Sequence, residues 1–216
     1  MGRCRVRKRS PRGSGEQLAE EILEATTDLL IAGGGSAGVS VRAVADRVGV
    51  TPPSIYLHFT DKDALLDAVC ARFFERFDAV MMAESADADG VLDRALAQGL
   101  AYVRFALQNP VIFREAFARS TPTPTQTDQV LMASAIQHFS ETVAEAMDAG
   151  LLPHGDVTAM VLRLWSVAHG VAALITAKPG LPWGDGMTVA EDVLRAAFSG
   201  FVQDSVKLEP MRPDVR

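Results

Sequence analysis

The chain has 216 residues, 48% of them apolar and 22% charged, with 21 Lys or Arg against 27 Asp or Glu. This length and apolar fraction are sufficient for a sizeable buried core and leave open whether the chain forms one domain or two. The longest apolar runs, such as residues 171–177, fall far short of the roughly 20 residues that a membrane-spanning helix requires, so we expect a soluble protein with no membrane partner.

The N-terminal segment is basic and precedes the first predicted helix. It lacks the apolar stretch of about 7 to 15 residues and the cleavage site of a secretory signal, so we expect a cytoplasmic protein. Residues 1–60 contain eight Lys or Arg against six Asp or Glu, whereas residues 61–216 contain 13 against 21. Residues 1–14 have the composition of an arm that neutralises DNA phosphates, and equally that of a disordered, solubilising tail. The basic residues of this arm are Arg3, Arg5, Arg7, Lys8, Arg9 and Arg12.

The rest of the chain is predicted to be all-α. Apolar residues recur mostly at helical spacing, and sustained strand-like alternation is rare. Thr60 is the predicted N-cap of a long helix, with Asp63 three residues further on in a variant of the capping box. About nine helices are expected, at residues 16–32, 41–48, 52–58, 61–84, 91–108, 110–119, 127–149, 155–177 and 188–207.

Residues 40–59 have the pattern of two short helices joined by a tight turn. Ser40 and Thr51 are the predicted N-caps, and Pro52 occupies the first helical position, where a missing N–H costs nothing. Gly49 lies at the turn, where a positive φ is needed and a Cβ would be penalised. A small apolar core is expected from Val44, Val48, Val50 and Ile55, and Ala45 is small where the two helices approach closely. This pattern predicts a helix-turn-helix, whose second helix reads base edges in the major groove.

The run VSVRAVADRVGVTPPSIYLHFTDKDALL, residues 39–66, resembles the DNA-binding domain of the TetR family of transcriptional regulators. The match includes the central IYLHF and the lysine Lys62 that opens the following helix. The resemblance implies a regulator, most commonly a repressor, that binds a palindromic operator in double-stranded DNA and is released by a small-molecule effector. The domains it implies are a basic arm (1–14), a helix-turn-helix domain (15–60), a ligand-binding and dimerisation domain (61–207, with 61–84 as the connecting helix) and a flexible tail (208–216).

The resemblance also implies roles for individual residues in DNA binding. Arg42 matches a position from which guanine is contacted, and bidentate Arg to guanine is the commonest specific contact. Ser40, Tyr56, His58 and Lys62 match phosphate contacts, and the residues expected to face bases are Thr51, Pro52, Pro53, Ser54 and Leu57. Each role has a plainer alternative: a packing histidine at 58, a half-buried tyrosine at 56 and a solvated charge at 42. Because few of these side chains form hydrogen bonds to bases, we expect DNA shape and the basic arm to contribute strongly.

The helices 155–177 and 188–207 are unusually apolar. Two such helices joined by a short loop are able to pair with their symmetry mates in a four-helix interface, which is how the TetR family usually forms homodimers. The alternative is that both helices are buried in a monomeric core. The apolar faces expected at the interface comprise Val157, Met160, Val161, Leu164, Ala168, Val171 and Ile175 on the first helix, and Val189, Val193, Ala196, Ala197 and Val202 on the second.

The segment WSVAHG at residues 165–170 resembles a Trp-x-x-x-His-Gly pattern found in one subset of TetR C-terminal domains. Gly170 is expected to permit close helix contact. A pocket for an apolar or amphipathic effector is predicted from bulky side chains with few polar ones, and for each of them ordinary core packing is the alternative. The candidates are Tyr102, Phe105, Phe113, Phe117, Met132, Phe139, Trp165 and His169.

Catalysis and cofactor binding are not expected. The four histidines offer only His138 with carboxylates at helical spacing, and the two cysteines, Cys4 and Cys70, have no metal-ligand spacing and form no disulfide framework. No phosphate-binding loop, dinucleotide fingerprint or nucleophile elbow is present. The competing interpretations are a helical small-molecule-binding protein without DNA-binding activity and a metal-dependent helical enzyme.

Overall fold

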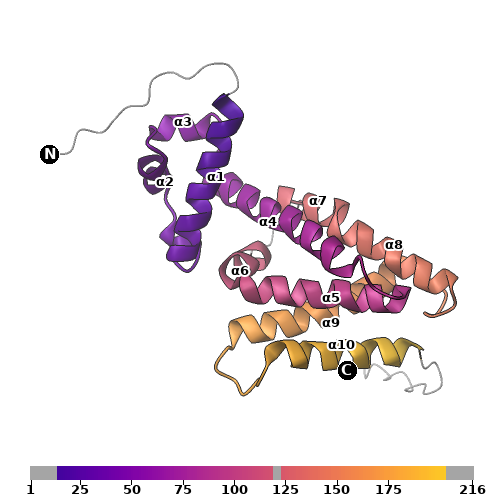
Figure 1. The fold of residues 1–216 in the computed structure, drawn as a ribbon. Coiled ribbons are helices and arrows are strands. Elements are labelled where there is room, and N and C mark those ends of the chain that lie inside the picture. The colour runs from indigo at the N-terminus through magenta and orange to yellow at the C-terminus, as the bar shows by residue number, and fades with distance from the viewer. Residues whose placement is uncertain (1–13, 119–122, 203–216) are drawn as a thin grey trace, which may run out of the picture. The chain divides into compact units, whose positions relative to one another are not determined.

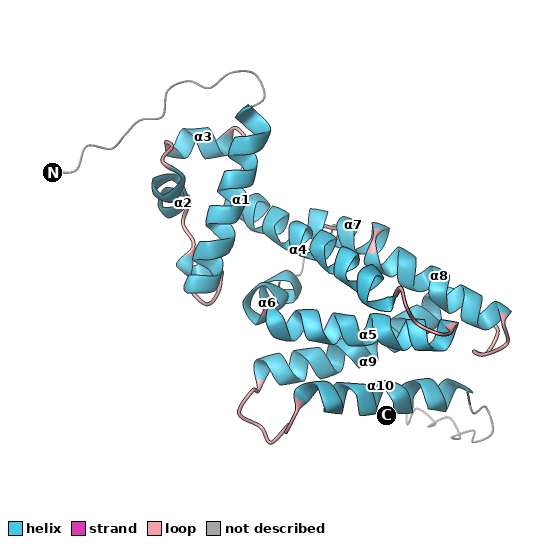
Figure 2. Ribbon diagram, viewed as in Figure 1, coloured by secondary structure: helices cyan, strands magenta, loops and turns pink. Residues whose placement is uncertain are grey.

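The computed structural model describes residues 14–118 and 123–202, and within these ranges the chain forms helices joined by loops and no strand (Figures 1 and 2). The helices are α1 (Ser14–Ala32), the 3₁₀ turn η1 (Ser36–Gly38), α2 (Val41–Val48), α3 (Pro52–Tyr56), α4 (Lys62–Ser85), α5 (Val91–Gln108), α6 (Pro110–Ala118), α7 (Gln126–Ala133), α8 (Ala135–Asp148), α9 (Val157–Ala177) and α10 (Gly186–Val202). The all-α fold class is confirmed. The basic arm at 1–13, the tail from residue 203 and residues 119–122 lie outside the described residues.

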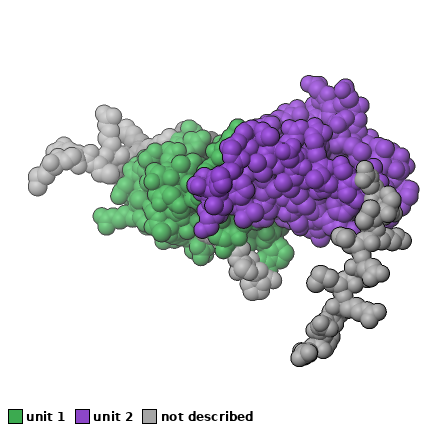
Figure 3. All heavy atoms as spheres, turned by 90° about the horizontal axis from the view of Figure 1, so that it is seen from below, with its two compact units in different colours: residues 1–80, 105–136 green, residues 81–104, 137–216 purple. Residues whose placement is uncertain are grey.

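The chain divides into two compact units (Figure 3). Unit 1 comprises residues 1–80 and 105–136, and unit 2 comprises residues 81–104 and 137–216. In unit 1, α1 packs against α2 and α6, and α2 packs against α3. The large, fully buried apolar side chains of its N-terminal part include Ile22, Leu30, Val44, Ile55, Leu65, Leu66 and Phe74.

Unit 2 contains the first part of α5, nearly all of α8, and α9 and α10. The last two helices pack against each other, and α10 also approaches α5 closely. At that approach, a Cβ added to Gly99 would lie 3.3 Å from Leu194 Cδ1, so the glycine leaves room for the leucine. The fully buried side chains include Val103, Val143, Val161 and Leu194.

The expected helix 127–149 is two helices in the structure. It is interrupted at Ser134, where φ is −121° and ψ is −94°. The Ser134 hydroxyl donates to the carbonyl of Val130 at 2.7 Å, and such bonds back to the preceding turn compete with regular helix geometry. The sequence pattern missed the break because the apolar periodicity continues across it.

The expected N-cap of α4 is also wrong by one residue. The helix begins at Lys62, and its cap is the carboxylate of Asp61, which accepts from the backbone N–H of Ala64 at 2.7 Å. The Thr60 hydroxyl instead donates to the Asp61 carboxylate at 3.3 Å. Asp61 accepts the backbone bond because it directly precedes the helix.

The helix α9 is long and apolar enough to cross a membrane by length and composition alone, with a mean hydropathy of 1.5 over 18 residues. Uninterrupted apolar runs, on which the sequence expectation rested, do not detect it because Arg163 and His169 divide the helix. A core helix has the same composition. In unit 2, α9 packs against α10 and buries Met160, Leu164 and Ala172.

Candidate functional site

The helix-turn-helix is held by a cap at its first helix and a left-handed glycine at its turn. The Ser40 side chain accepts from the backbone N–H of Ala43 at 3.1 Å, as expected for the N-cap of α2. Gly49 has φ 78° and ψ 34°, a conformation that costs a residue with a Cβ about 1 kcal/mol or more. Val44, Ala45 and Ile55 are buried between the helices. The turn therefore fixes the angle at which α3 leaves α2.

The cap of α3 differs from the expectation. Thr51 is the N-cap residue, but its side chain makes no bond to the helix backbone. The physical reason lies in the next residues: Pro53 has no N–H, and the N–H of Ser54 donates to the Thr51 carbonyl oxygen at 2.9 Å. The two hydroxyls of Thr51 and Ser54 lie 3.1 Å apart and bond to each other. The start of α3 is thus fixed by two prolines and a side-chain pair.

Most of the residues predicted to contact DNA are exposed to solvent. Leu57 is 84% exposed and Tyr56 is 52% exposed, although both are large and partly apolar. Leu57 follows the end of α3, which is two residues shorter than expected. Of the other predicted contacts, Ser40, Arg42, Thr51, Pro52 and Pro53 are exposed, and Ser54, His58 and Lys62 are half-buried.

Two arginines on α2 differ in their surroundings. Arg47 is paired with Asp28 of α1 at 2.6 Å. Arg42 is exposed and has no ion pair or hydrogen bond among the residues that the structure describes. Its guanidinium group is therefore available to an outside acceptor, whereas that of Arg47 binds α1 to α2.

The turn η1, which precedes α2, is held from two other helices of unit 1. Lys62 of α4 donates from Nζ to the carbonyl oxygen of Ser36 at 2.7 Å. The backbone N–H of Ser36 in turn donates to the carboxylate of Glu115 on α6 at 3.2 Å. From the sequence, Lys62 was expected to contact a DNA phosphate, and Glu115 was not identified. In this structure, both side chains position the chain at the entry to the helix-turn-helix.

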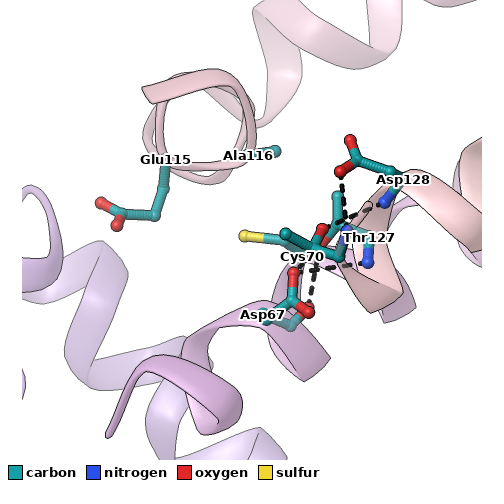
Figure 4. Close-up of a pocket in the computed structure, with 7 residues that line it drawn as sticks. Asp67, Cys70, Glu115, Ala116, Thr127 and Asp128 are labelled. Atoms are coloured by element: carbon teal, nitrogen blue, oxygen red, sulfur yellow. Dashed lines mark hydrogen bonds between the residues drawn. The ribbon is translucent and has the colours of Figure 1, made fainter. Parts of the chain in front are cut away.

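A carboxylate on α4 holds the start of α7 (Figure 4). Asp67 accepts from the backbone N–H of Gln126 at 2.8 Å and from the Thr127 hydroxyl at 2.6 Å. Burial raises the pKa of Asp67, but these hydrogen bonds to the ionised carboxylate outweigh it, so the pKa lies below its ordinary value. Cys70 and Glu115 lie beside this carboxylate in the same small pocket of unit 1. No local pattern indicates this role for Asp67, because its partners are about 60 residues away.

In unit 2, three of the predicted ligand-binding residues lie together. The Tyr102 hydroxyl and His169 Nδ1 are 2.8 Å apart, and the rings of Trp165 and His169 are in edge contact with centroids 6.1 Å apart. Burial raises the pKa of the Tyr102 phenol and lowers the pKa of the His169 imidazole. Burial therefore favours the neutral form of both groups.

Of the remaining predicted ligand-binding residues, four lie in unit 1 and Phe139 lies in unit 2. In unit 1, Phe105 contacts Phe73 with ring centroids 4.7 Å apart. Phe113 and Phe117 have centroids 5.2 Å apart, also in unit 1. Met132 on α7 is 56% exposed. Phe139 on α8 is half-buried.

Gln98 was not identified from the sequence. It lies on α5, one turn before Tyr102, and is only 2% exposed. Its side-chain oxygen Oε1 has no hydrogen-bond partner among the described residues. The i, i+4 spacing of Gln98 and Tyr102 could have indicated a shared polar face, but nothing in the sequence shows that this face is turned inward.

The apolar faces expected at a subunit interface differ in exposure between α9 and α10. The α9 face expected at a subunit interface is largely buried within the chain, including Val161 and Leu164. The large apolar residues that α9 exposes are instead Leu162 and Leu174, at 49% and 56%. A Cβ added to Gly170 would meet nothing within 4 Å, so this glycine mediates no close helix contact within the described chain. On α10, Val193 and Val202 of the expected face are exposed.

No cluster of three or more His, Cys, Asp or Glu side chains in the described ranges could hold a metal ion.

Two family models match separate segments of the chain. Residues 22–69 match the model of the tetR family of bacterial regulatory proteins, and residues 95–197 match the tetracyclin repressor-like C-terminal domain. None of the curated proteins matches the chain.

Solved structures with the same fold cover most of the chain. A Rhodococcus sp. RHA1 protein of unknown function is 26% identical, with a TM-score of 0.73 over 86% of this chain and 96% of its own. A TetR family transcription regulator from Marinobacter aquaeolei VT8 is 18% identical, with a TM-score of 0.62 over 87% and 98%. The transcriptional regulator FadR from Bacillus subtilis, solved in complex with stearoyl-CoA, is 15% identical, with a TM-score of 0.68 over 84% and 98%.

Proposed function

Since this chain belongs to the tetR family of bacterial regulatory proteins, we propose that it is a repressor released from its operator by a small, mainly apolar effector. As a member of the family it is a transcription regulator with a DNA-binding helix-turn-helix and a ligand-binding C-terminal domain. The repression, the palindromic operator, the homodimer and the cytoplasmic location are the finer parts of the proposal. The domain limits proposed are those expected above, with the helix-turn-helix in residues 15–60.

The single observation that carries DNA binding is the surface at α3. An 84% exposed leucine and a 52% exposed tyrosine stand at the end of a helix whose start is fixed by two prolines. Exposed large apolar side chains are costly in water, but they suit contact with thymine methyl groups in the major groove. In the proposal, Thr51, Pro52, Pro53, Ser54 and Leu57 face bases. Arg42 contacts a guanine, and phosphates are contacted by Ser40, Tyr56, His58 and Lys62.

A homodimer is proposed through α9 and α10. Leu162 and Leu174 on α9 and Val193 and Val202 on α10 are exposed in the single chain. Isologous pairing of these helices with their symmetry mates would remove this apolar surface from water. The open space at Gly170 would then admit a partner helix. Two helix-turn-helix motifs related by a twofold axis require two half-sites, which is why the operator is proposed to be palindromic.

An effector site is proposed at the Tyr102, Trp165 and His169 cluster of unit 2, while Phe105, Phe113, Phe117, Met132 and Phe139 remain weaker candidates. The cluster combines aromatic rings with a few polar atoms, which is the usual composition of a small-molecule site. FadR from Bacillus subtilis, which has the same fold, binds stearoyl-CoA. This complex supports the proposal that the same fold holds a small molecule in this chain.

Selection of bound duplexes from a random DNA pool tests the proposal. We expect a palindromic consensus with half-sites about one helical turn apart, and affinity for the consensus that falls steeply with salt. A consensus without twofold symmetry would contradict the homodimer. No enrichment of any duplex in dilute salt would contradict a regulator and favour a helical small-molecule-binding protein without DNA-binding activity.

A further inference from the structure

Three polar side chains of unit 2 lie on two of its helices, whereas the buried hydroxyls of Ser85, Thr142 and Thr176 donate to carbonyl oxygens of their own helices. Gln98 and Tyr102 lie one turn apart on α5, and His169 lies on α9, where it contacts the Tyr102 hydroxyl. The neighbouring buried positions of both helices are apolar, including Ala101 and Val103 on α5. The cluster is thus a small polar group within an otherwise apolar core.

The amide oxygen of Gln98 is the feature that needs an explanation. Glutamine is rarely buried to this degree, and its Oε1 makes no hydrogen bond within the described residues. A buried acceptor without a donor destabilises the folded protein, whereas an apolar side chain of similar size would avoid that cost. Such an arrangement is understandable if a donor arrives from outside the chain.

The charges around the cluster limit what that donor belongs to. No Lys or Arg among the described residues of unit 2 is buried. Arg94 pairs with Glu145, Arg104 with Glu84, and Arg195 with Glu191. An ionised carboxylate or phosphate entering the cluster would therefore lose its hydration without gaining a cation, which is strongly unfavourable.

We propose that Gln98 Oε1 accepts a hydrogen bond from a hydroxyl group of the effector, which is an uncharged, mainly apolar alcohol or phenol. This inference rests on the proposed effector site in unit 2 and specifies the chemistry of its ligand. The hydroxyl group of the effector donates to the amide oxygen, and the apolar skeleton of the effector packs against the surrounding apolar side chains. An ether of the same size accepts but does not donate, so it leaves Oε1 unsatisfied.

The first test uses no ligand. Gln98→Leu removes the unsatisfied oxygen at nearly constant volume, so the melting temperature of the ligand-free protein should stay level or rise by about 2 to 4 °C. Gln137→Leu is the matched control, because Gln137 is exposed and bonds to Glu141 on the surface of α8. A clear fall in the melting temperature of the Gln98 variant, with the control unchanged, would show that the amide is already satisfied and would overturn the proposal.

The second test is calorimetric titration of the full chain with two matched series. Each series consists of a hydroxyl compound, an ether and a carboxylate. The aliphatic series is octan-1-ol, 1-methoxyheptane and octanoate, and the aromatic series is 2-naphthol, 2-methoxynaphthalene and 2-naphthoate. In at least one series the hydroxyl compound should bind about tenfold or more tightly than the ether and the anion. Gln98→Leu should abolish that preference, and Gln137→Leu should retain it. Equal affinity for hydroxyl compound and ether, or no binding in either series at millimolar concentration, would overturn the proposal.

Release of the selected operator is measured separately. If a hydroxyl compound binds through Gln98 but leaves the operator complex intact, the effector role in the proposed function fails while the site stands. If no probe binds and the protein still binds its operator, the Gln98 site fails while the regulator stands.

Discussion

The helix-turn-helix and the C-terminal bundle are built on different principles. In residues 40–59, the cap and the turn are set by neighbours in the sequence: a serine three residues before the amide it caps, and a glycine at the left-handed position of the turn. In unit 2, the important contacts join residues far apart, such as Tyr102 and His169, which are 67 positions apart. The cap and the turn of the proposed DNA-reading surface are thus encoded locally, whereas its attachment to α1 and α6 and the polar cluster of unit 2 depend on the tertiary fold.

The largest effect is expected from a substitution in the proposed dimer interface of the C-terminal bundle, and not from one in the recognition helix. Val193→Asp places a charge on the exposed apolar face of α10, so the homodimer should dissociate. Because two linked half-site contacts exceed one in affinity, operator binding should fall about 100-fold or more. Analytical ultracentrifugation and fluorescence anisotropy measure the two effects. Leu151→Asp, at another exposed apolar residue, is the control, and equal losses in both variants would contradict the interface.

The second largest effect is expected from a substitution in the helix-turn-helix. Arg42→Ala should relax preference at one base pair of each half-site, worth about 1 to 3 kcal/mol of discrimination. Repeating the DNA selection with the variant measures it. Arg47→Ala on the same helix loses only the pair with Asp28 and should keep the consensus. An unchanged consensus for the Arg42 variant would show that this arginine is a solvated charge.

A smaller effect tests the turn. Gly49→Ala should lower the free energy of unfolding by about 1 kcal/mol, because alanine is strained at a φ of 78°. Urea denaturation measures it. Gly155→Ala is the control, since that glycine has open space and an ordinary φ and should change stability by less than about 0.5 kcal/mol. If both variants are equally stable, the left-handed turn is not what fixes α3.

The smallest effect concerns the long-range contact between Asp67 and α7. The pKa of Asp67 is lowered in the folded state, so its carboxylate contributes stability above its ordinary value of 3.8, and that contribution is lost as pH falls through the lower, folded value. Asp67→Asn should therefore cost about 0.5 kcal/mol at neutral pH and nothing in strong acid. Thermal melts of both proteins against pH measure the difference, with Asp87→Asn, on the surface, as the control. A constant difference down to acid pH would contradict the role of the charge.

The same contrast explains what could be predicted from the sequence. The all-α class, the cap at Ser40 and the turn at Gly49 follow from periodicity and from residues with strong local preferences. The break at Ser134 and the cap at Asp61 are local as well. The break accompanies a hydroxyl bond back to Val130, and the cap depends on Asp61 rather than Thr60 accepting from Ala64. Packing with distant helices decides which face of α9 is buried and turns Gln98 inward. Neither feature has a local signal in the sequence.

The most direct test of the central claim, that α3 enters the major groove, is cleavage of DNA by a reagent fixed to its end. Leu57→Cys in a Cys4→Ser chain places a thiol at a position that is 84% exposed, while Cys70 remains buried. With an iron chelate on that thiol, the bound operator should be cut in the major groove at one place in each half-site, about 10 base pairs apart. Cleavage that is spread evenly along the duplex, or absent from an operator that the labelled protein still binds, would contradict the entry of α3 into the groove.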